Sequence, residues 1–127
     1  MKLLLDTHTA IWWLDAPRKL GKDGYSLIAD PENEVLISAV IPWEIAIKIN
    51  SGKMPQHMLV TDFLRVLREE EFTLLQIHPL HAIRSGLLPF RHRDPFDRIL
   101  AAQSLELGLP LISVDKVFDL YGVERIW

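Results

Sequence analysis

The sequence contains no cysteine among its 127 residues. This absence excludes disulfide bonds, thiolate nucleophiles and cysteine-based zinc sites. No apolar run approaches the ~20 residues that a membrane-spanning helix requires. The apolar stretch near the N-terminus ends at Asp6 after only three residues, whereas the apolar part of a secretory signal needs roughly 7–15. We therefore expect a cytoplasmic protein that does not enter a membrane.

Positive charge is not in excess, because 14 Lys and Arg residues face 17 Asp and Glu residues and give a formal net charge of −3. A protein that simply coats nucleic acid is usually basic, so this class is disfavoured. A nuclease stays open, because metal-binding carboxylates subtract from the total charge. There is also no internal repeat, linker or long block of like charge. With 49% apolar and 24% charged residues, the sequence indicates one globular domain over residues 1–127.

Short apolar segments alternate with segments of helical periodicity. The expected strands cover residues 2–5, 35–37, 73–77, 111–114 and, at one edge, 123–127. The expected helices cover residues 7–14, 24–29, 42–50, 61–70, 80–87 and 94–107. Strands that are apolar throughout and separated by helices imply a parallel sheet covered on both faces. The fold class is therefore α/β with three layers: a central, mostly parallel sheet of four to five strands with helices on both faces.

Several carboxylates stand alone in apolar surroundings near the ends of these strands. Asp6 follows the first strand and Asp115 directly follows the fourth, while Glu44 shares the stretch 35–52 only with Lys48. Ligand sites of parallel sheets lie beyond the carboxyl ends of the strands. Gathered there, these carboxylates would repel one another unless a cation compensated them. Oxygen ligands without cysteine favour a hard ion, Mg²⁺ or Mn²⁺.

Each of these carboxylates also has a purely structural explanation. Asp6 can cap the helix that follows it. Glu44 and Lys48 are spaced i, i+4 and can form a helical ion pair worth ~0.2–0.5 kcal/mol. Asp115 can be an ordinary turn residue. The helix that carries Glu44 is apolar on almost every side, which favours function slightly over a solvated ion pair there.

The segment Asp94-Pro95-Phe96-Asp97 is typical of a helix N-terminus. Asp at the N-cap, Pro at the first position and Asp at the third satisfy the free backbone N–H groups and the helix dipole. Spacing alone therefore favours a structural role for both aspartates.

Four blocks of sequence occur in order over nearly the whole chain. They are Leu3–His8 with the following Trp12 and Trp13, Ile37–Ala39 with Trp43–Lys48 and Gly52-Lys53, His92–Gln103, and Leu111–Asp115. Together these blocks resemble PIN-domain toxins of the VapC type, and the third block is the most specific. The resemblance implies a PIN-like fold, so the expected sheet takes this family's three-layer form.

The resemblance implies that Asp6, Glu44, Asp97 and Asp115 are the metal-binding and catalytic acids, and it leaves Asp94 as the cap. The implied activity is Mg²⁺-dependent hydrolysis of RNA phosphodiester bonds, with Mn²⁺ as an alternative ion. The implied partners are RNA, a cognate antitoxin and a second copy of the chain. The sequence departs from the family at two positions, because Pro42 replaces a small hydroxyl residue and Ser113 replaces threonine.

Four residues are candidates for RNA contact: Ser113, Lys48, Arg93 and Arg98. The two arginines belong to the densest basic patch of the sequence and could bind the RNA backbone, although a solvated loop is an equal alternative. A haloacid-dehalogenase-like enzyme would need a second aspartate where His8 stands, so that class is disfavoured. The serious alternative is a catalytically silent PIN scaffold that binds a protein or RNA, and the presence of all four acids disfavours it.

Overall fold

Five strands form one sheet in the computed structural model, which describes residues 1–127. The strands are β1 (Lys2–Leu5), β2 (Glu34–Ser38), β3 (Thr73–Leu75), β4 (Leu111–Ile112) and β5 (Arg125–Ile126). Their order is β3-β2-β1-β4-β5, and every neighbouring pair is parallel. The expected α/β class is therefore confirmed, and the sheet is parallel throughout.

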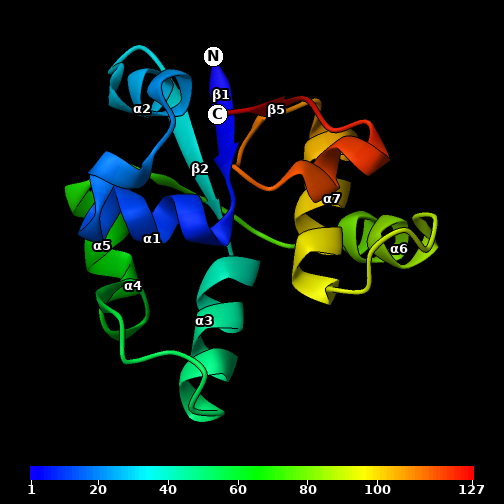
Figure 1. Ribbon diagram of the computed structural model, residues 1–127, viewed down its shortest axis with the longest axis horizontal. Coiled ribbons are helices and arrows are strands. Elements are labelled where there is room, and N and C mark those ends of the chain that lie inside the picture. Colours follow the sequence, from blue (N-terminus) through cyan, green and yellow to red (C-terminus); the bar gives the residue numbers. More distant parts are fainter.

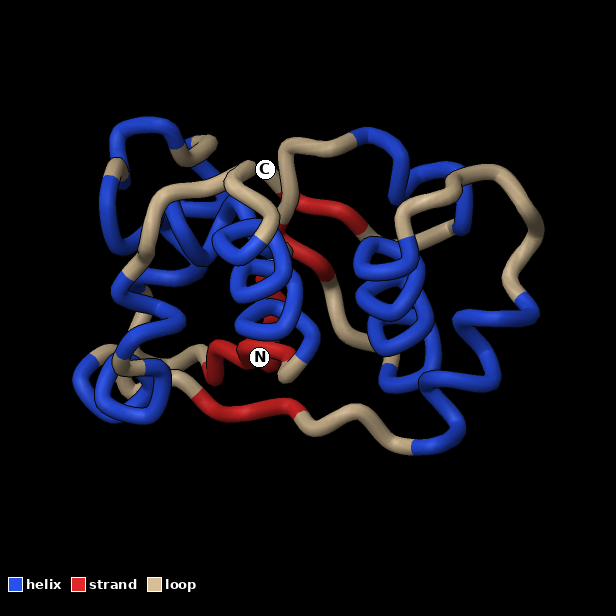
Figure 2. The backbone as a smooth tube through the Cα atoms, turned by 90° about the horizontal axis from the view of Figure 1, so that it is seen from below, coloured by secondary structure: helices blue, strands red, loops and turns tan.

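Helices cover both faces of this sheet. They are α1 (Thr7–Asp15), α2 (Lys22–Ala29), α3 (Val40–Asn50), α4 (Met58–Thr61), α5 (Phe63–Glu69), α6 (Pro79–Leu87) and α7 (Pro95–Leu107). Two short 3₁₀ helices, η1 (Pro17–Lys19) and η2 (Lys116–Tyr121), complete the elements. In Figures 1 and 2, α1, α2 and α5 lie on one side of the strands and α6 and α7 on the other. None of the helices is long and apolar enough to cross a membrane.

The two central strands are almost entirely apolar, as expected where helices cover both sides of a parallel sheet. The three leucines of β1 have no exposed surface, and neither do Leu111 and Ile112 of β4. These residues lie at the centre of one continuous hydrophobic core. The core fixes β1 and β4 side by side, and the segments that follow these two strands therefore begin at the same edge of the sheet.

The observed helix boundaries differ from the expected ones by two residues or more at three places, of which one is α2, which begins at Lys22 and not at residue 24. The helix expected over 61–70 is divided into α4 and α5, because Asp62 between them leaves the helical conformation at φ −145° and ψ 51°. Helix α3 begins at Val40, two residues before Pro42. Proline fits there because the first turn of a helix does not use its backbone N–H groups.

Candidate metal centre

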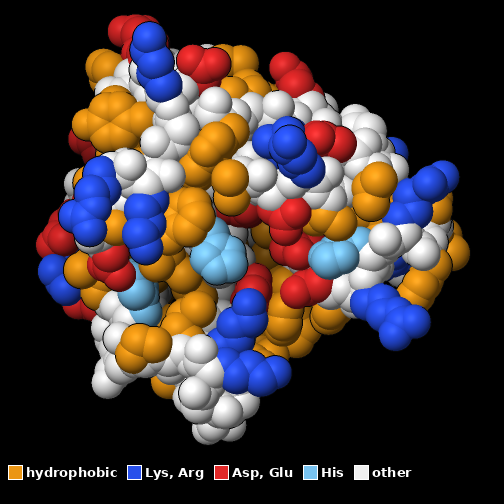
Figure 3. Space-filling view, in the orientation of Figure 1, with side chains coloured by type: hydrophobic (Ala, Val, Ile, Leu, Met, Phe, Trp, Pro, Cys, Tyr) orange, Lys and Arg blue, Asp and Glu red, His pale blue; other side chains and the backbone are white.

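The carboxyl ends of β1 and β4 meet where the chain changes direction across the sheet. The connections after β1 lead toward β2, whereas β4 pairs with the opposite side of β1. Crevices at such points are the usual ligand sites of parallel sheets. Figure 3 shows acidic side chains gathered in a hollow of this face, between α1, α3 and α7, with histidines on both sides.

Asp6 is buried directly after β1 and caps α1. One carboxylate oxygen, Oδ1, accepts the Thr9 N–H at 2.8 Å, and the other, Oδ2, accepts the hydroxyl of Ser113. Burial raises the pKa of Asp6 above its ordinary value, although the bonds from Ser113 and Thr9 oppose this rise. The capping explanation is thus confirmed, and the same carboxylate also lies at the meeting point of β1 and β4.

Glu44 is buried on α3, and both of its oxygens have partners. Oε1 accepts the hydroxyl of Thr7 at 2.7 Å, and Oε2 accepts Lys48 Nζ at 2.5 Å. The expected i, i+4 ion pair therefore exists, but it is not an exposed one, since Glu44 is only 3% exposed. Burial would lower the pKa of Lys48, yet the bond and charge of Glu44 and the charges of Asp94 and Asp97 raise it. This ammonium therefore lies in the field of three carboxylates.

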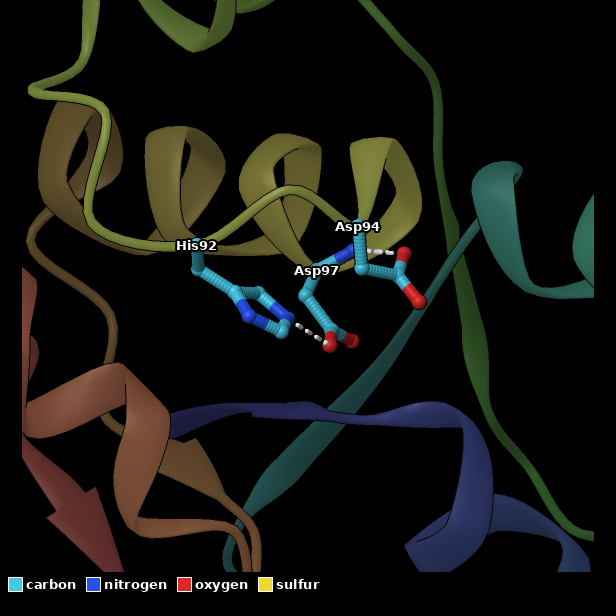
Figure 4. A group of neighbouring side chains, drawn as sticks. All are labelled: His92, Asp94 and Asp97. Carbon is cyan, nitrogen blue, oxygen red and sulfur yellow. Dashed lines mark hydrogen bonds and ion pairs between the residues drawn. The ribbon is translucent and has the colours of Figure 1, made fainter.

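Asp97 lies in the first turn of α7 and faces His92 from the preceding loop. The His92 Nε2 atom is 2.9 Å from Asp97 Oδ2, and Figure 4 shows the ring and the carboxylate pointing toward each other. Burial raises the pKa of Asp97 to about 6, with the charges of Asp94 and Glu44 in the same direction and His92 opposing. Asp97 and Glu44 therefore interact electrostatically across the hollow between α7 and α3.

Asp94 is the N-cap of α7, as the sequence predicted. Its Oδ1 accepts the N–H groups of Phe96 at 2.9 Å and of Asp97 at 3.2 Å. It also belongs to a group with His92 and Asp97, in which one possible ligand atom from each residue lies within 4.8 Å of the others. The sequence does not predict this group, because nothing in the spacing of His92 shows that the loop folds back onto α7.

Asp115 is exposed and caps η2, since its Oδ1 accepts the Val117 N–H at 3.0 Å. Its own N–H donates to Ser113 Oγ at 3.0 Å. Ser113 therefore ties the backbone of Asp115 to the carboxylate of Asp6. The structural explanation of Asp115 is confirmed, and its position beside β4 keeps it at the same edge of the sheet as Asp6.

Two of the four candidates for RNA contact lie in other positions than expected. Ser113 has no exposed surface and uses its hydroxyl on Asp6, so it cannot touch RNA. Arg98 is 6% exposed, and its guanidinium is occupied by groups of the protein itself. The burial of both side chains and their bonds within the protein argue against the expected contact with substrate. Arg93 is exposed, and Lys48 pairs with Glu44.

The donor set fits a hard divalent cation. Carboxylate oxygens dominate it, and no cysteine is present. Burial and neighbouring negative charge both raise the pKa of Asp97, which means that its ionised form lacks sufficient positive charge around it. A divalent cation would supply that charge.

Comparisons with known proteins extend over nearly the full chain. The model of the PIN domain family matches residues 3–124. The Ribonuclease VapC22 of Mycobacterium tuberculosis is 29% identical over 115 residues, which are 90% of this chain and 87% of that protein. VapBC2 from Rickettsia felis, solved bound to a DNA fragment from the promoter, has a TM-score of 0.70 at 13% identity and covers 100% of this chain and 99% of its own. DNA-bound VapBC from Salmonella typhimurium has a TM-score of 0.70 at 16% identity, and the match covers 99% of this chain and 97% of that chain.

Proposed function

This chain belongs to the PIN domain family, and from that premise we propose that it is a Mg²⁺-dependent endoribonuclease. It hydrolyses RNA phosphodiester bonds and acts as the toxin of a VapBC-type toxin–antitoxin pair. Its similarity to a protein named as a ribonuclease supports the activity. The similarity of its fold to that of chains from VapBC complexes agrees with this placement.

The observation that carries the proposal is the electrostatic state of Asp97. Its carboxylate is partly buried, lies in the field of the charges of Asp94 and Glu44, and has a pKa of about 6 for these reasons. Asp94 caps α7 and Glu44 pairs with Lys48, but the charge of Asp97 adds repulsion to both carboxylates. A site for a divalent cation accounts for the arrangement.

We assign the ion to Asp6, Glu44, Asp97 and Asp115, with Mn²⁺ as a possible replacement for Mg²⁺. When bound, the ion would activate a water molecule and neutralise charge on the leaving oxygen. The oxygens of Asp6 and Glu44 that accept protein hydrogen bonds keep lone pairs for a cation, because each carboxylate oxygen accepts more than one partner.

Two cationic side chains near the carboxylates bind the RNA substrate. Lys48 lies on α3, and the exposed Arg93 lies in the loop before α7, four residues ahead of Asp97. Their charges attract the phosphate backbone and hold a phosphate near the carboxylates. Arg98 has no part in this contact, since its guanidinium is buried.

The proposed partners are a cognate antitoxin and a second copy of the chain. One solved relative is described as a member of the VapBC family of toxin-antitoxin systems. The protein would act in the cytoplasm, where its RNA substrates are found.

A cleavage assay on mixed RNAs tests the proposal. The purified chain should cut RNA with Mg²⁺ or Mn²⁺ and should stop when EDTA removes the ion. Asp97→Asn should abolish cleavage, whereas Asp94→Asn should be much milder because Asn caps a helix about as well as Asp. Asp23→Asn, on the exposed first turn of α2, is the control. RNA binding without metal-dependent cleavage would favour the silent PIN scaffold instead.

A further inference from the structure

A single buried guanidinium organises the loop that precedes α7. Arg98 donates hydrogen bonds of 2.8 to 3.3 Å to four backbone carbonyls and one hydroxyl. The acceptors are the carbonyl oxygens of Ser85, Leu88, Pro89 and His92 and the hydroxyl of Tyr121. The ring of Phe90 covers the guanidinium at 5.2 Å. One side chain thus holds the end of α6 and the following loop against α7.

The hydrogen bonds from Arg98 take the place of backbone–backbone hydrogen bonds, of which the loop has few. Between Leu88 and His92, the only backbone hydrogen bond formed within the loop joins the Arg91 N–H to the Pro89 carbonyl at 2.8 Å. A buried charge is costly unless its donors are satisfied, and none of the salt bridges of the protein includes Arg98. Closing the loop does not by itself require a buried charge. The use of a buried guanidinium here therefore indicates that the exact conformation of the loop matters for function.

The loop delivers the ring of His92 to Asp97. Arg98 and the Tyr121 hydroxyl both donate to the His92 carbonyl, at 3.3 and 3.5 Å, and fix the backbone from which the ring extends. The ring Nε2 then lies 2.9 Å from Asp97 Oδ2. A carboxylate that holds a cation only accepts hydrogen bonds, so Nε2 must carry the hydrogen. This bond uses one lone pair of Oδ2 and leaves Oδ1 open.

We propose that Arg98 and His92 are positioning residues for the metal ligand Asp97, an inference that rests on the proposed metal-dependent function. Arg98 shapes the loop, and His92 donates Nε2–H to Oδ2 and so directs Oδ1 toward the cation. Hydrogen bonds of this kind to metal ligands fix the orientation of the ligand, and their loss typically weakens metal binding 10–100-fold. The chain therefore reaches its full metal affinity only when the loop after α6 is folded onto α7.

Isothermal titration with Mn²⁺ tests the proposal on the metal itself, without RNA. In His92→Ala, the Mn²⁺ dissociation constant should rise about tenfold or more. In His92→Gln, most of the affinity should return, because the side-chain amide nitrogen can donate to Asp97 in place of Nε2. His57→Ala is the matched control, since this histidine also contacts a carboxylate, with its Nε2 atom 2.5 Å from Asp15 Oδ2, but outside the proposed site. The Mn²⁺ dissociation constant of His57→Ala should equal that of wild type.

A spectroscopic measurement separates positioning from direct ligation. His92 also has a ligand atom within reach of the group, so the ring could bind the ion itself. Electron spin-echo envelope modulation of bound Mn²⁺ should show no directly coordinated imidazole nitrogen. A strong coupling to ¹⁴N that disappears in His92→Ala would overturn the positioning role and make His92 a ligand.

Arg98→Lys tests the role of the guanidinium, because one ammonium cannot reach four carbonyls. The Mn²⁺ dissociation constant should rise as in His92→Ala. If Arg98→Lys does not fold, Tyr121→Phe removes one partner of Arg98 and should give a smaller rise in the same direction. Equal affinities in wild type, His92→Ala and Tyr121→Phe would overturn the inference. Strong Mn²⁺ binding without RNA cleavage would contradict only the proposed function, and a wild type without Mn²⁺ affinity would contradict both.

Discussion

Ser113 donates its hydroxyl hydrogen to Asp6, 107 positions earlier in the chain. The same Oγ accepts the N–H of Asp115 at 3.0 Å. Both contacts depend on the parallel pairing of β1 with β4, which brings the ends of the two strands together. The hydroxyl that the family usually places here on a threonine is thus retained, and it orients a carboxylate of the site.

Asp6→Asn should abolish metal-dependent RNA cleavage and leave the fold intact. The amide oxygen can still accept the Thr9 N–H, and the amide nitrogen can donate to Ser113 Oγ in place of the present bond. Burial disfavours the ionised form of Asp6 and raises its pKa, so the neutral amide should keep or increase the melting temperature. Circular dichroism melting and the cleavage assay check the two statements. Cleavage at the wild-type rate would show that Asp6 holds no ion.

The free energy of unfolding should depend on pH in a way that reflects the raised pKa of Asp97. Its pKa of about 6 in the folded protein exceeds the ordinary value of 3.8, so the folded state binds the proton more tightly than the unfolded state. This contribution to stability is complete below pH 3.8 and is lost as the pH rises through about 6. In EDTA, wild type should therefore lose stability relative to Asp97→Asn between pH 4 and pH 7.

Urea unfolding at several pH values measures this difference. The comparison between the two proteins removes the contributions of the other groups, such as Asp119, whose pKa is lowered by its bond with Arg125. A difference that stays constant over this range would contradict the account. In the presence of Mn²⁺ the trend should reverse, because protons compete with the ion for Asp97.

The protein should form a homodimer. Helix α6 and the loop after it expose Ile83, Leu87 and Phe90, which are 57%, 79% and 80% accessible. Apolar surface of this kind favours association. Sedimentation at micromolar concentration should show a dimer, and Leu87→Glu should shift it toward monomer. Leu64→Glu, at a single exposed leucine of α5, is the control, and a wild-type monomer would be evidence against the prediction.

An arginine of the antitoxin should occupy the acidic hollow. Asp94, Asp97 and Glu44 give this region negative potential when no cation is bound, and a guanidinium pairs bidentately with carboxylates better than lysine does. Expression of this chain alone should arrest growth, and co-expression with the partner should restore it. Replacing the arginines of the partner's tail should release RNA cleavage by the complex. Full inhibition that survives the loss of every tail arginine would contradict this mechanism.

The sequence by itself determined the order of strands and helices and the caps Asp6 and Asp94. Apolar segments without charge, such as residues 3–5 and 111–112, form buried strands, because the removal of apolar surface from water is favourable. Asp94 followed by Pro95 begins α7 at the expected residue, because local backbone requirements alone decide a helix start. Such local signals do not depend on the rest of the chain.

Only the tertiary structure decided which side chains meet. The arginines around the start of α7 look equivalent in the sequence, yet Arg93 is exposed and Arg98 is buried under the loop. His92 meets Asp97 because that loop folds back on the helix, and Ser113 meets Asp6 because β4 pairs with β1. These contacts follow from the packing of elements far apart in the chain, where burial and unsatisfied hydrogen-bonding groups decide the position of each charge.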